Sequence, residues 1–190
     1  MLLALILVSA YVLGAIPTSY LVVRWLTGRD IRTMGTGNPG TMNVLDTVGW
    51  RPAAAVAIGD IGKGMAAVGL AYGVGLEDPH AVLAALAAII GHDWPVFLRF
   101  RGGNGMGPAV GGLAALLPLA FAIGLGVAVA VLLAIRSRRV AGLAGLLVVP
   151  LVALQLDAPD AKVFGALSII LLPALKIATS EGFSLARPSR

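Results

Sequence analysis

The feature that most constrains the fold of this chain is a series of long apolar stretches, each bounded by a few polar or charged residues. An α-helix needs about 20 apolar residues to cross the hydrocarbon core of a bilayer. Hydrophobic residues make up 58% of the chain and charged residues only 12%, whereas a soluble domain carries about 25% charged residues. Lipid must therefore cover part of the surface. We predict an all-α integral membrane protein that forms a single polytopic domain over residues 1–190.

Five of the apolar stretches have the length of a membrane-spanning helix. They are Leu2–Leu26, Pro52–Leu76, His80–Leu98, Val140–Leu156 and Val163–Thr179. The first stretch lacks the basic start and the small-residue cleavage site of a signal peptide, so we expect it to remain as a span. Gly14 and Pro17 interrupt it in a way that membrane helices tolerate.

A sixth stretch, Pro108–Ile135, is too long for one crossing. Its 28 residues would make a helix of about 42 Å, against a hydrocarbon core of ~30 Å. Pro118 would kink or divide such a helix. A single crossing would also place the basic cluster Arg136–Arg139 outside, against the positive-inside rule. We therefore predict two short passes or a re-entrant piece before Pro118, and about seven segments in total.

Charge bias gives this layout an orientation, with the N-terminus outside and the C-terminus inside. Twelve of the fourteen Lys and Arg residues then lie at the inner side, Lys162 lies outside and Lys63 lies in the membrane. The residues placed at the inner side are Arg24, Arg29, Arg32, Arg51, Arg99, Arg101, Arg136, Arg138, Arg139, Lys176, Arg187 and Arg190. The same layout brings both glycine-rich polar loops to the cytoplasmic face.

These two loops, residues 34–43 (loop one) and 99–105 (loop two), hold most of the groups suited to binding a charged ligand. Successive glycine N–H groups can form a concave anion site, and arginine side chains bind phosphate or carboxylate oxygens. The candidates are Gly35, Thr36, Gly37, Asn38, Gly40, Asn43, Arg99, Arg101, Gly102, Gly103, Asn104 and Gly105. The alternatives are that loop one is a flexible connector and that the arginines only anchor the protein at lipid head groups.

Several other functions lack support. Residues 35–40 spell G-x-G-x-x-G, but a dinucleotide site needs a strand before this motif and a helix after it. The basic residues lie in short clusters at the ends of spans, so no nucleic-acid partner is predicted. The chain contains no cysteine, which excludes a thiolate nucleophile or a thiolate metal site. We predict no metal, and nothing in the sequence indicates more than a monomer.

Three ionisable residues in or beside the spans are also candidates. Asp60 and Lys63 are three residues apart, so they share a helix face and can pair. Charges within a span usually face a protein interior or a wet cavity, and either a structural pair or a functional site fits this pattern. His92 is the one plausible base near the loops that titrates close to neutral pH, although a structural histidine is the alternative.

Taken together, these motifs resemble the bacterial acyl-phosphate:glycerol-3-phosphate acyltransferases. Residues 35–49 are similar to the family's G-S-G-N-x-G-A-T-N-V-x-R-x-x-G, and residues 60–64 to its D-x-x-K-G. Residues 91–105 resemble its G-H-x-x-P-V-F-x-x-F-K-G-G-K-G, with Arg101 and Asn104 as replacements. Residues 14–18 and 28–32 also resemble family segments.

The resemblance implies an enzyme with seven spans in the bacterial cytoplasmic membrane and an active site facing the cytoplasm. Such an enzyme transfers a fatty acyl group from acyl phosphate to glycerol 3-phosphate and yields lysophosphatidate. Acyl phosphate is the co-substrate, and no cofactor is implied. Thr36, Asn38 and His92 then become the catalytic candidates. The other loop residues, with Asp60 and Lys63, become substrate-binding candidates.

Three departures from the family pattern leave other functions open. Asp46 replaces the arginine of the first motif, Asn104 replaces a lysine of the second, and the third motif is missing from Leu175–Arg190. Asp46 is kept as a substrate-binding candidate by position. The alternatives are a paralogue with a different acceptor, and a non-catalytic membrane protein that binds a lipid or a phosphate. A small transporter has only Asp60 and Lys63 in its favour.

Overall fold

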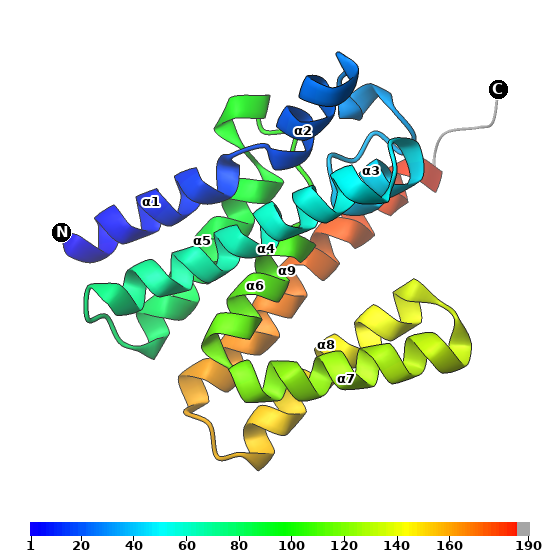
Figure 1. Cartoon of the computed structure of the whole chain (residues 1–190). Coiled ribbons are helices and arrows are strands. Elements are labelled where there is room, and N and C mark those ends of the chain that lie inside the picture. Colours follow the sequence, from blue (N-terminus) through cyan, green and yellow to red (C-terminus); the bar gives the residue numbers. More distant parts are fainter. Residues whose placement is uncertain (186–190) are drawn as a thin grey trace.

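The computed structural model describes residues 1–185 of the chain, and that part consists of helices without a strand (Figure 1). The elements are α1 (Leu2–Ala15), α2 (Thr18–Thr27), η1 (Ile31–Thr33), α3 (Thr41–Thr47), α4 (Trp50–Gly73), α5 (Asp78–Asp93), η2 (Val96–Leu98), α6 (Met106–Leu116), α7 (Pro118–Ile135), α8 (Arg138–Gln155) and α9 (Asp160–Leu185).

Six stretches of this structure are long and apolar enough to cross a bilayer, and α6 is a shorter apolar helix beside them. The six are Leu2–Thr27, Trp50–Gly73, Asp78–Leu98, Pro118–Ile135, Arg138–Gln155 and Asp160–Thr179. The predicted all-α membrane fold, with about seven segments of which at least one is short, is therefore confirmed.

Proline residues divide two of the predicted spans. The long stretch breaks between α6 and α7 at Leu117, and Pro118 opens α7, where its missing N–H costs no helical hydrogen bond. This confirms the broken form of residues 108–135. The first span is also interrupted, because α1 ends at Ala15 and α2 begins at Thr18. The predicted tolerated interruption at Pro17 is thus a true break.

Two boundaries near the loops differ from the prediction. Loop one is not irregular throughout, because α3 begins at Thr41 within it. The third span does not run as one helix to Leu98, since α5 ends at Asp93 and the short η2 turn follows after Pro95. Proline disfavours helical geometry in the residue before it, which explains why the helix stops there.

Small residues allow the central helices to pack closely. The main buried cluster is rich in alanine and joins α1, α4, α5, α6 and α9. Glycines lie where backbones meet: Gly14 and Gly91 between α1 and α5, and Gly64 and Gly111 between α4 and α6. A methyl group at any of these four would overlap the backbone of the neighbouring helix. Such packing of small residues is typical of membrane helices.

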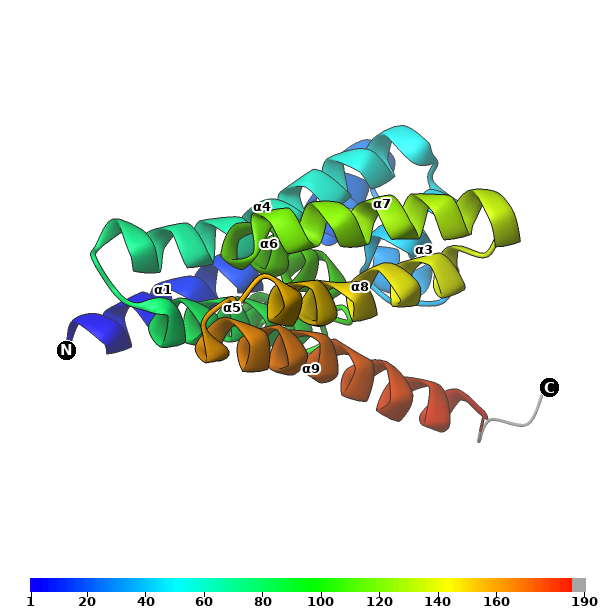
Figure 2. The same ribbon diagram turned by 90° about the horizontal axis from the view of Figure 1, so that it is seen from below.

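The long helices place the loops at one end of the molecule (Figures 1 and 2). Loop one, loop two and the α7–α8 turn lie at that end, whereas the α4–α5 and α8–α9 turns and the start of α1 lie at the other. Helices α7 and α8 pack mainly against each other and form a hairpin beside the central helices. The N-terminus therefore lies at the end opposite the loops. The predicted inner-side residues Arg187 and Arg190 lie outside the described residues.

Candidate active site

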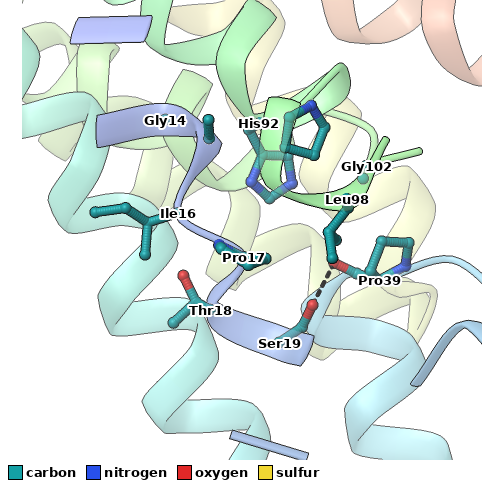
Figure 3. A pocket seen from close by; sticks show the side chains of 12 residues that line it. Gly14, Ile16, Pro17, Thr18, Ser19, Pro39, His92, Leu98 and Gly102 are labelled. Atoms are coloured by element: carbon teal, nitrogen blue, oxygen red, sulfur yellow. Dashed lines mark hydrogen bonds between the residues drawn. The ribbon is translucent and has the colours of Figure 1, made fainter. Parts of the chain in front are cut away.

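The break between α1 and α2 is held by side chains from elsewhere in the fold. At the interruption, Lys63 Nζ donates a hydrogen bond to the Ile16 carbonyl oxygen at 2.5 Å. Just after the break, Thr18 Oγ1 donates to Asp60 Oδ1 at 2.8 Å. Ser19 Oγ donates to the Pro39 carbonyl oxygen at 2.7 Å, and Figure 3 shows this bond. The break thus connects α4 on one side with loop one on the other.

Asp60 and Lys63 form a buried ion pair on α4, with Lys63 Nζ 2.7 Å from Asp60 Oδ1. The two residues are only 2% and 7% exposed. A buried pair repays its desolvation only when other hydrogen bonds complete it, and Thr18 and the Ile16 carbonyl supply these here. The predicted pairing is therefore confirmed, and the pair's other hydrogen bonds go to Thr18 and Ile16 at the α1–α2 break.

His92 lies between this ion pair and loop two. It belongs to the last turn of α5, and its side chain is 9% exposed. Its Nδ1 is 3.7 Å from Asp60 Oδ1, which is longer than a hydrogen bond and leaves an electrostatic contact. The opposite ring nitrogen, Nε2, abuts Gly103, where even a methyl group would overlap the ring. The imidazole is thus fixed on both sides.

A small pocket lies beside His92 and joins these parts (Figure 3). Its walls come from the α1–α2 break, from loop one, and from the segment that ends in loop two. The lining residues are Gly14, Ala15, Ile16, Pro17, Thr18, Ser19, Pro39, His92, Pro95, Leu98, Gly102 and Gly103. Both predicted loops therefore meet at one site, as the sequence analysis expected.

Asn43 organises loop one from the buried face of α3. Its Oδ1 accepts a hydrogen bond from the Thr36 N–H at 3.0 Å, and its Nδ2 donates to the Met34 carbonyl at 3.0 Å. The Gly37 N–H also donates to the Met34 carbonyl, at 2.9 Å. Gly35 and Gly37 have φ values of 51° and 75°, so glycine serves the turns of this loop.

Loop two is tied to the end of α5 in a similar way. The Gly102 N–H donates to the Asp93 carbonyl at 3.2 Å, and the Gly103 N–H donates to the His92 carbonyl at 3.1 Å. In loop one the N–H groups of Thr36, Gly37 and Gly40 are bonded as well. These glycine-rich amides therefore bind the protein itself, whereas no such bond involves the successive N–H groups of Asn104 and Gly105 within the described residues.

Arg32 links the two loops and was not among the predicted site residues. It forms an ion pair with Asp30, with Nη2 2.7 Å from Oδ2. Its Nη1 donates to the Leu98 carbonyl at 3.4 Å, just before loop two. The hydrogen bond from Arg32 holds the pKa of Asp30 below its ordinary value, and the same bond raises the pKa of Arg32.

Other predicted residues remain on the open side of the site. Thr36, Arg99 and Arg101 are exposed, and Asn38 and Asn104 are half-buried. Asp46 is exposed on α3 and does not line the pocket. The structure therefore separates a buried polar centre, built on Asp60, Lys63 and His92, from exposed groups at its rim.

Sequence reasoning also missed Thr18 and Ser19 as site residues. Both hydroxyls follow directly after Pro17 within an otherwise apolar span. Serine and threonine hydroxyls can form hydrogen bonds with polar groups that a helix break leaves without partners. Their position directly after Pro17 could therefore have identified them as site residues. Asp93 was not among the predicted site residues, and its burial could not be read from the sequence.

Comparison with known proteins agrees with this geometry. The family described as glycerol-3-phosphate acyltransferase matches residues 4–180. "Glycerol-3-phosphate acyltransferase" of Synechococcus sp. (strain CC9902) is 39% identical over 87% of this chain and 82% of the relative. "Glycerol-3-phosphate acyltransferase 1" of Dehalococcoides mccartyi is 48% identical over 60% of this chain. That match spans only 55% of the Dehalococcoides protein, so the chain covers about half of its length.

A solved structure is similar over nearly the whole fold. The crystal structure of PlsY (YgiH), an integral membrane glycerol 3-phosphate acyltransferase in its glycerol 3-phosphate form, superposes with a TM-score of 0.85 and 26% identity. The match covers 96% of this chain and 92% of that one. The sequence match over residues 4–180 and this shared fold confirm the resemblance that the motifs indicated. This chain belongs to the glycerol-3-phosphate acyltransferase family.

Proposed function

We propose that this chain transfers a fatty acyl group from an acyl phosphate to glycerol 3-phosphate, producing lysophosphatidate for phospholipid synthesis. The observation that carries the proposal is the pocket beside His92, in which both loops meet the α1–α2 break. Family membership supports the reaction class. Glycerol 3-phosphate is named for the related structure, and the exposed Arg99 and Arg101 at the rim suit such an anion.

The chemistry is a direct displacement. The acceptor hydroxyl oxygen attacks the acyl carbonyl carbon, the bond from that carbon to the bridging phosphate oxygen breaks, and phosphate leaves. His92, fixed between Asp60 and Gly103, is the proposed acceptor of the hydroxyl proton. The alternative acceptor of this proton is the substrate's own phosphate. Thr36, Asn38 and the rim arginines are proposed to stabilise charge on the acyl and phosphate oxygens.

The surroundings follow from the same proposal. The acyl chain lies among the apolar helices while the phosphate lies at the loop end, which we place at the cytoplasmic face of a bacterial inner membrane. The N-terminus is then outside and the C-terminus inside. The enzyme acts as a monomer, without a cofactor, a metal or nucleic acid.

The test is acyl transfer by the purified protein with a radiolabelled acyl phosphate. The acceptor is glycerol 3-phosphate, neutral glycerol, or none. We expect lysophosphatidate only with glycerol 3-phosphate, with one phosphate released per product. Product with glycerol and not with glycerol 3-phosphate would instead assign a different acceptor. No phosphate release with any acyl phosphate would refute catalysis and favour a binding protein.

Replacing His92 by glutamine separates the two proton acceptors. If His92 takes the proton, kcat should fall by about 10²- to 10⁴-fold, and the KM for glycerol 3-phosphate should change little. An unchanged kcat would assign that role to the substrate phosphate. Replacing the exposed-turn residue Asp157 by asparagine is the matched control, because Asp157 lies in the α8–α9 turn at the far end of the molecule.

A further inference from the structure

The side chain of Asp93 has no role in the proposed reaction, yet its position is unusual. It is the last residue of α5 and is 0% exposed. Within the described part of the chain, neither of its carboxyl oxygens has a hydrogen-bond partner. A buried polar group without a partner is costly, and in a native structure such a group needs an explanation.

The carboxyl group of Asp93 faces the start of α6. A methyl group added at Gly105, the residue that caps this helix, would lie 2.9 Å from Oδ1 and 3.2 Å from Oδ2. The first N–H groups of a helix lack partners inside the helix, and the positive end of the helix dipole lies there. The carboxyl group of Asp93 thus packs against the residue at which α6 begins.

The backbone of Asp93 and of its neighbour His92 forms hydrogen bonds with the glycines of loop two. The Asp93 carbonyl accepts the Gly102 N–H at 3.2 Å, and the neighbouring His92 carbonyl accepts the Gly103 N–H at 3.1 Å. The segment from Gly102 to Gly105 is thus hydrogen-bonded at one end to the backbone at residues 92–93. At its other end it packs against the Asp93 side chain.

A cation from α9 completes the surroundings of this residue. Lys176 Nζ lies 4.3 Å from the centroid of the Trp94 ring, next to Asp93 in the chain. An electrostatic interaction also joins Lys176 to the Asp93 carboxyl. The carboxyl group therefore lies between the start of α6 and a cation of α9.

We propose that Asp93 is a positioning residue that holds loop two against His92 through the first turn of α6. Its catalytic consequence rests on the proposed function, since loop two is there assigned to phosphate binding. Loss of the Asp93 carboxyl group releases the Gly102–Gly105 segment, so Gly103 no longer packs firmly against the imidazole and the rim arginines lose their fixed position.

The decisive experiment measures loop position without turnover. The chain has no cysteine, so a nitroxide label on Met106→Cys, in the exposed first position of α6, is specific. A label on Leu133→Cys, exposed on α7, is the control. In Asp93→Asn we expect greater label mobility at position 106 and none of that gain at position 133. Unchanged mobility at 106, or an equal gain at both sites, would overturn the proposal.

Kinetics of the unlabelled Asp93→Asn protein give a second readout. We expect the KM for glycerol 3-phosphate to rise about 5- to 10-fold, with a smaller change in kcat. A lower melting temperature with an unchanged KM would instead assign Asp93 a purely structural role and overturn the proposal. Because label mobility needs no substrate, an inactive wild-type protein would refute the proposed function while leaving the loop measurement intact.

Gly105→Ala disturbs the same contact from the opposite side and serves if Asp93→Asn fails to fold. Its methyl group presses on the Asp93 oxygens, and the residue has a φ of 66°, which strains any non-glycine residue. We expect the same selective gain in mobility at position 106. A rigid label at 106 in Gly105→Ala would count against the proposal.

Discussion

The buried pair of Asp60 and Lys63 allows a sharp test by a double-mutant cycle. Replacing Lys63 by methionine leaves the Asp60 carboxylate 2% exposed with Thr18 as its remaining hydrogen-bond donor. Replacing Asp60 by leucine leaves the buried Lys63 ammonium with the Ile16 carbonyl. Breaking a buried pair on one side costs about 3–5 kcal/mol of unfolding free energy, so each single variant should be strongly destabilised.

The double variant Asp60→Leu/Lys63→Met should recover much of this loss. Both charges disappear together; methionine matches lysine in volume, and leucine fills the space of the aspartate with a somewhat larger side chain. What remains is the loss of two hydrogen bonds, to Thr18 and to the Ile16 carbonyl, at about 1 kcal/mol each or somewhat more for groups left buried. The cycle should therefore show a favourable coupling of at least about 3 kcal/mol, the smallest value that these losses allow.

The assay is reversible unfolding of each variant in mixed micelles, followed by helix content, with acyl transfer measured on the same preparations. The stability of the double variant should return while its activity does not, because His92 then lacks the Asp60 charge 3.7 Å from Nδ1. Additive destabilisation in the double variant would refute the ion-pair reasoning. A stable double variant with full activity would refute the assignment of Asp60 to the site.

Three further predictions concern the rim and the loops. Asp46→Arg together with Asn104→Lys adds three units of positive charge, and after solvent screening the KM for glycerol 3-phosphate should fall about tenfold; an unchanged KM would show that these positions lie away from the phosphate. Asn43→Ala removes the bonds to Thr36 and Met34 and should cost about 2–3 kcal/mol of unfolding free energy, whereas an equal loss in Asn38→Ala would argue against a special role. The Asp30 pKa is lowered in the folded state, so its contribution to stability is present above the ordinary value of 3.8 and is lost as the pH falls through the folded value. Melting temperatures measured from pH 6 down to about pH 2 should therefore decline less in Asp30→Asn than in the wild type, and parallel curves would contradict this.

The architecture was largely predictable from the sequence because its signals are local. Apolar length marked the spans, and Pro118 combined with the Arg136–Arg139 cluster required a broken segment there. Pro17 carried the same signal, but its effect was underestimated because a proline in a membrane helix can be tolerated, as Pro150 and Pro173 are within α8 and α9.

The details of the site were less predictable because they depend on tertiary contacts. Glycine-rich composition indicates that a backbone can approach a ligand, but not whether its amides are already bonded, as those of Gly37, Gly102 and Gly103 are. The three-residue spacing of Asp60 and Lys63 predicted their pairing, whereas their partners come from elsewhere: Ile16 from the α1–α2 break and Thr18 from the start of α2. The burial of Asp93 depends on α6 and could not be inferred from its neighbours in the chain.

Acyl transfer is proposed to take place in the pocket beside His92, where the two loops meet. Gly103→Ala tests this proposal directly, because the added methyl group overlaps the His92 ring. Gly126→Ala on α7 is the matched control, since a methyl group there meets no atom within 4 Å. With both proteins folded as judged by melting temperature, we expect acyl transfer to glycerol 3-phosphate to fall at least about 100-fold in Gly103→Ala, as a displacement of about 1 Å can cost that much, and to stay at the wild-type level in Gly126→Ala. Wild-type activity in a folded Gly103→Ala protein would contradict the account.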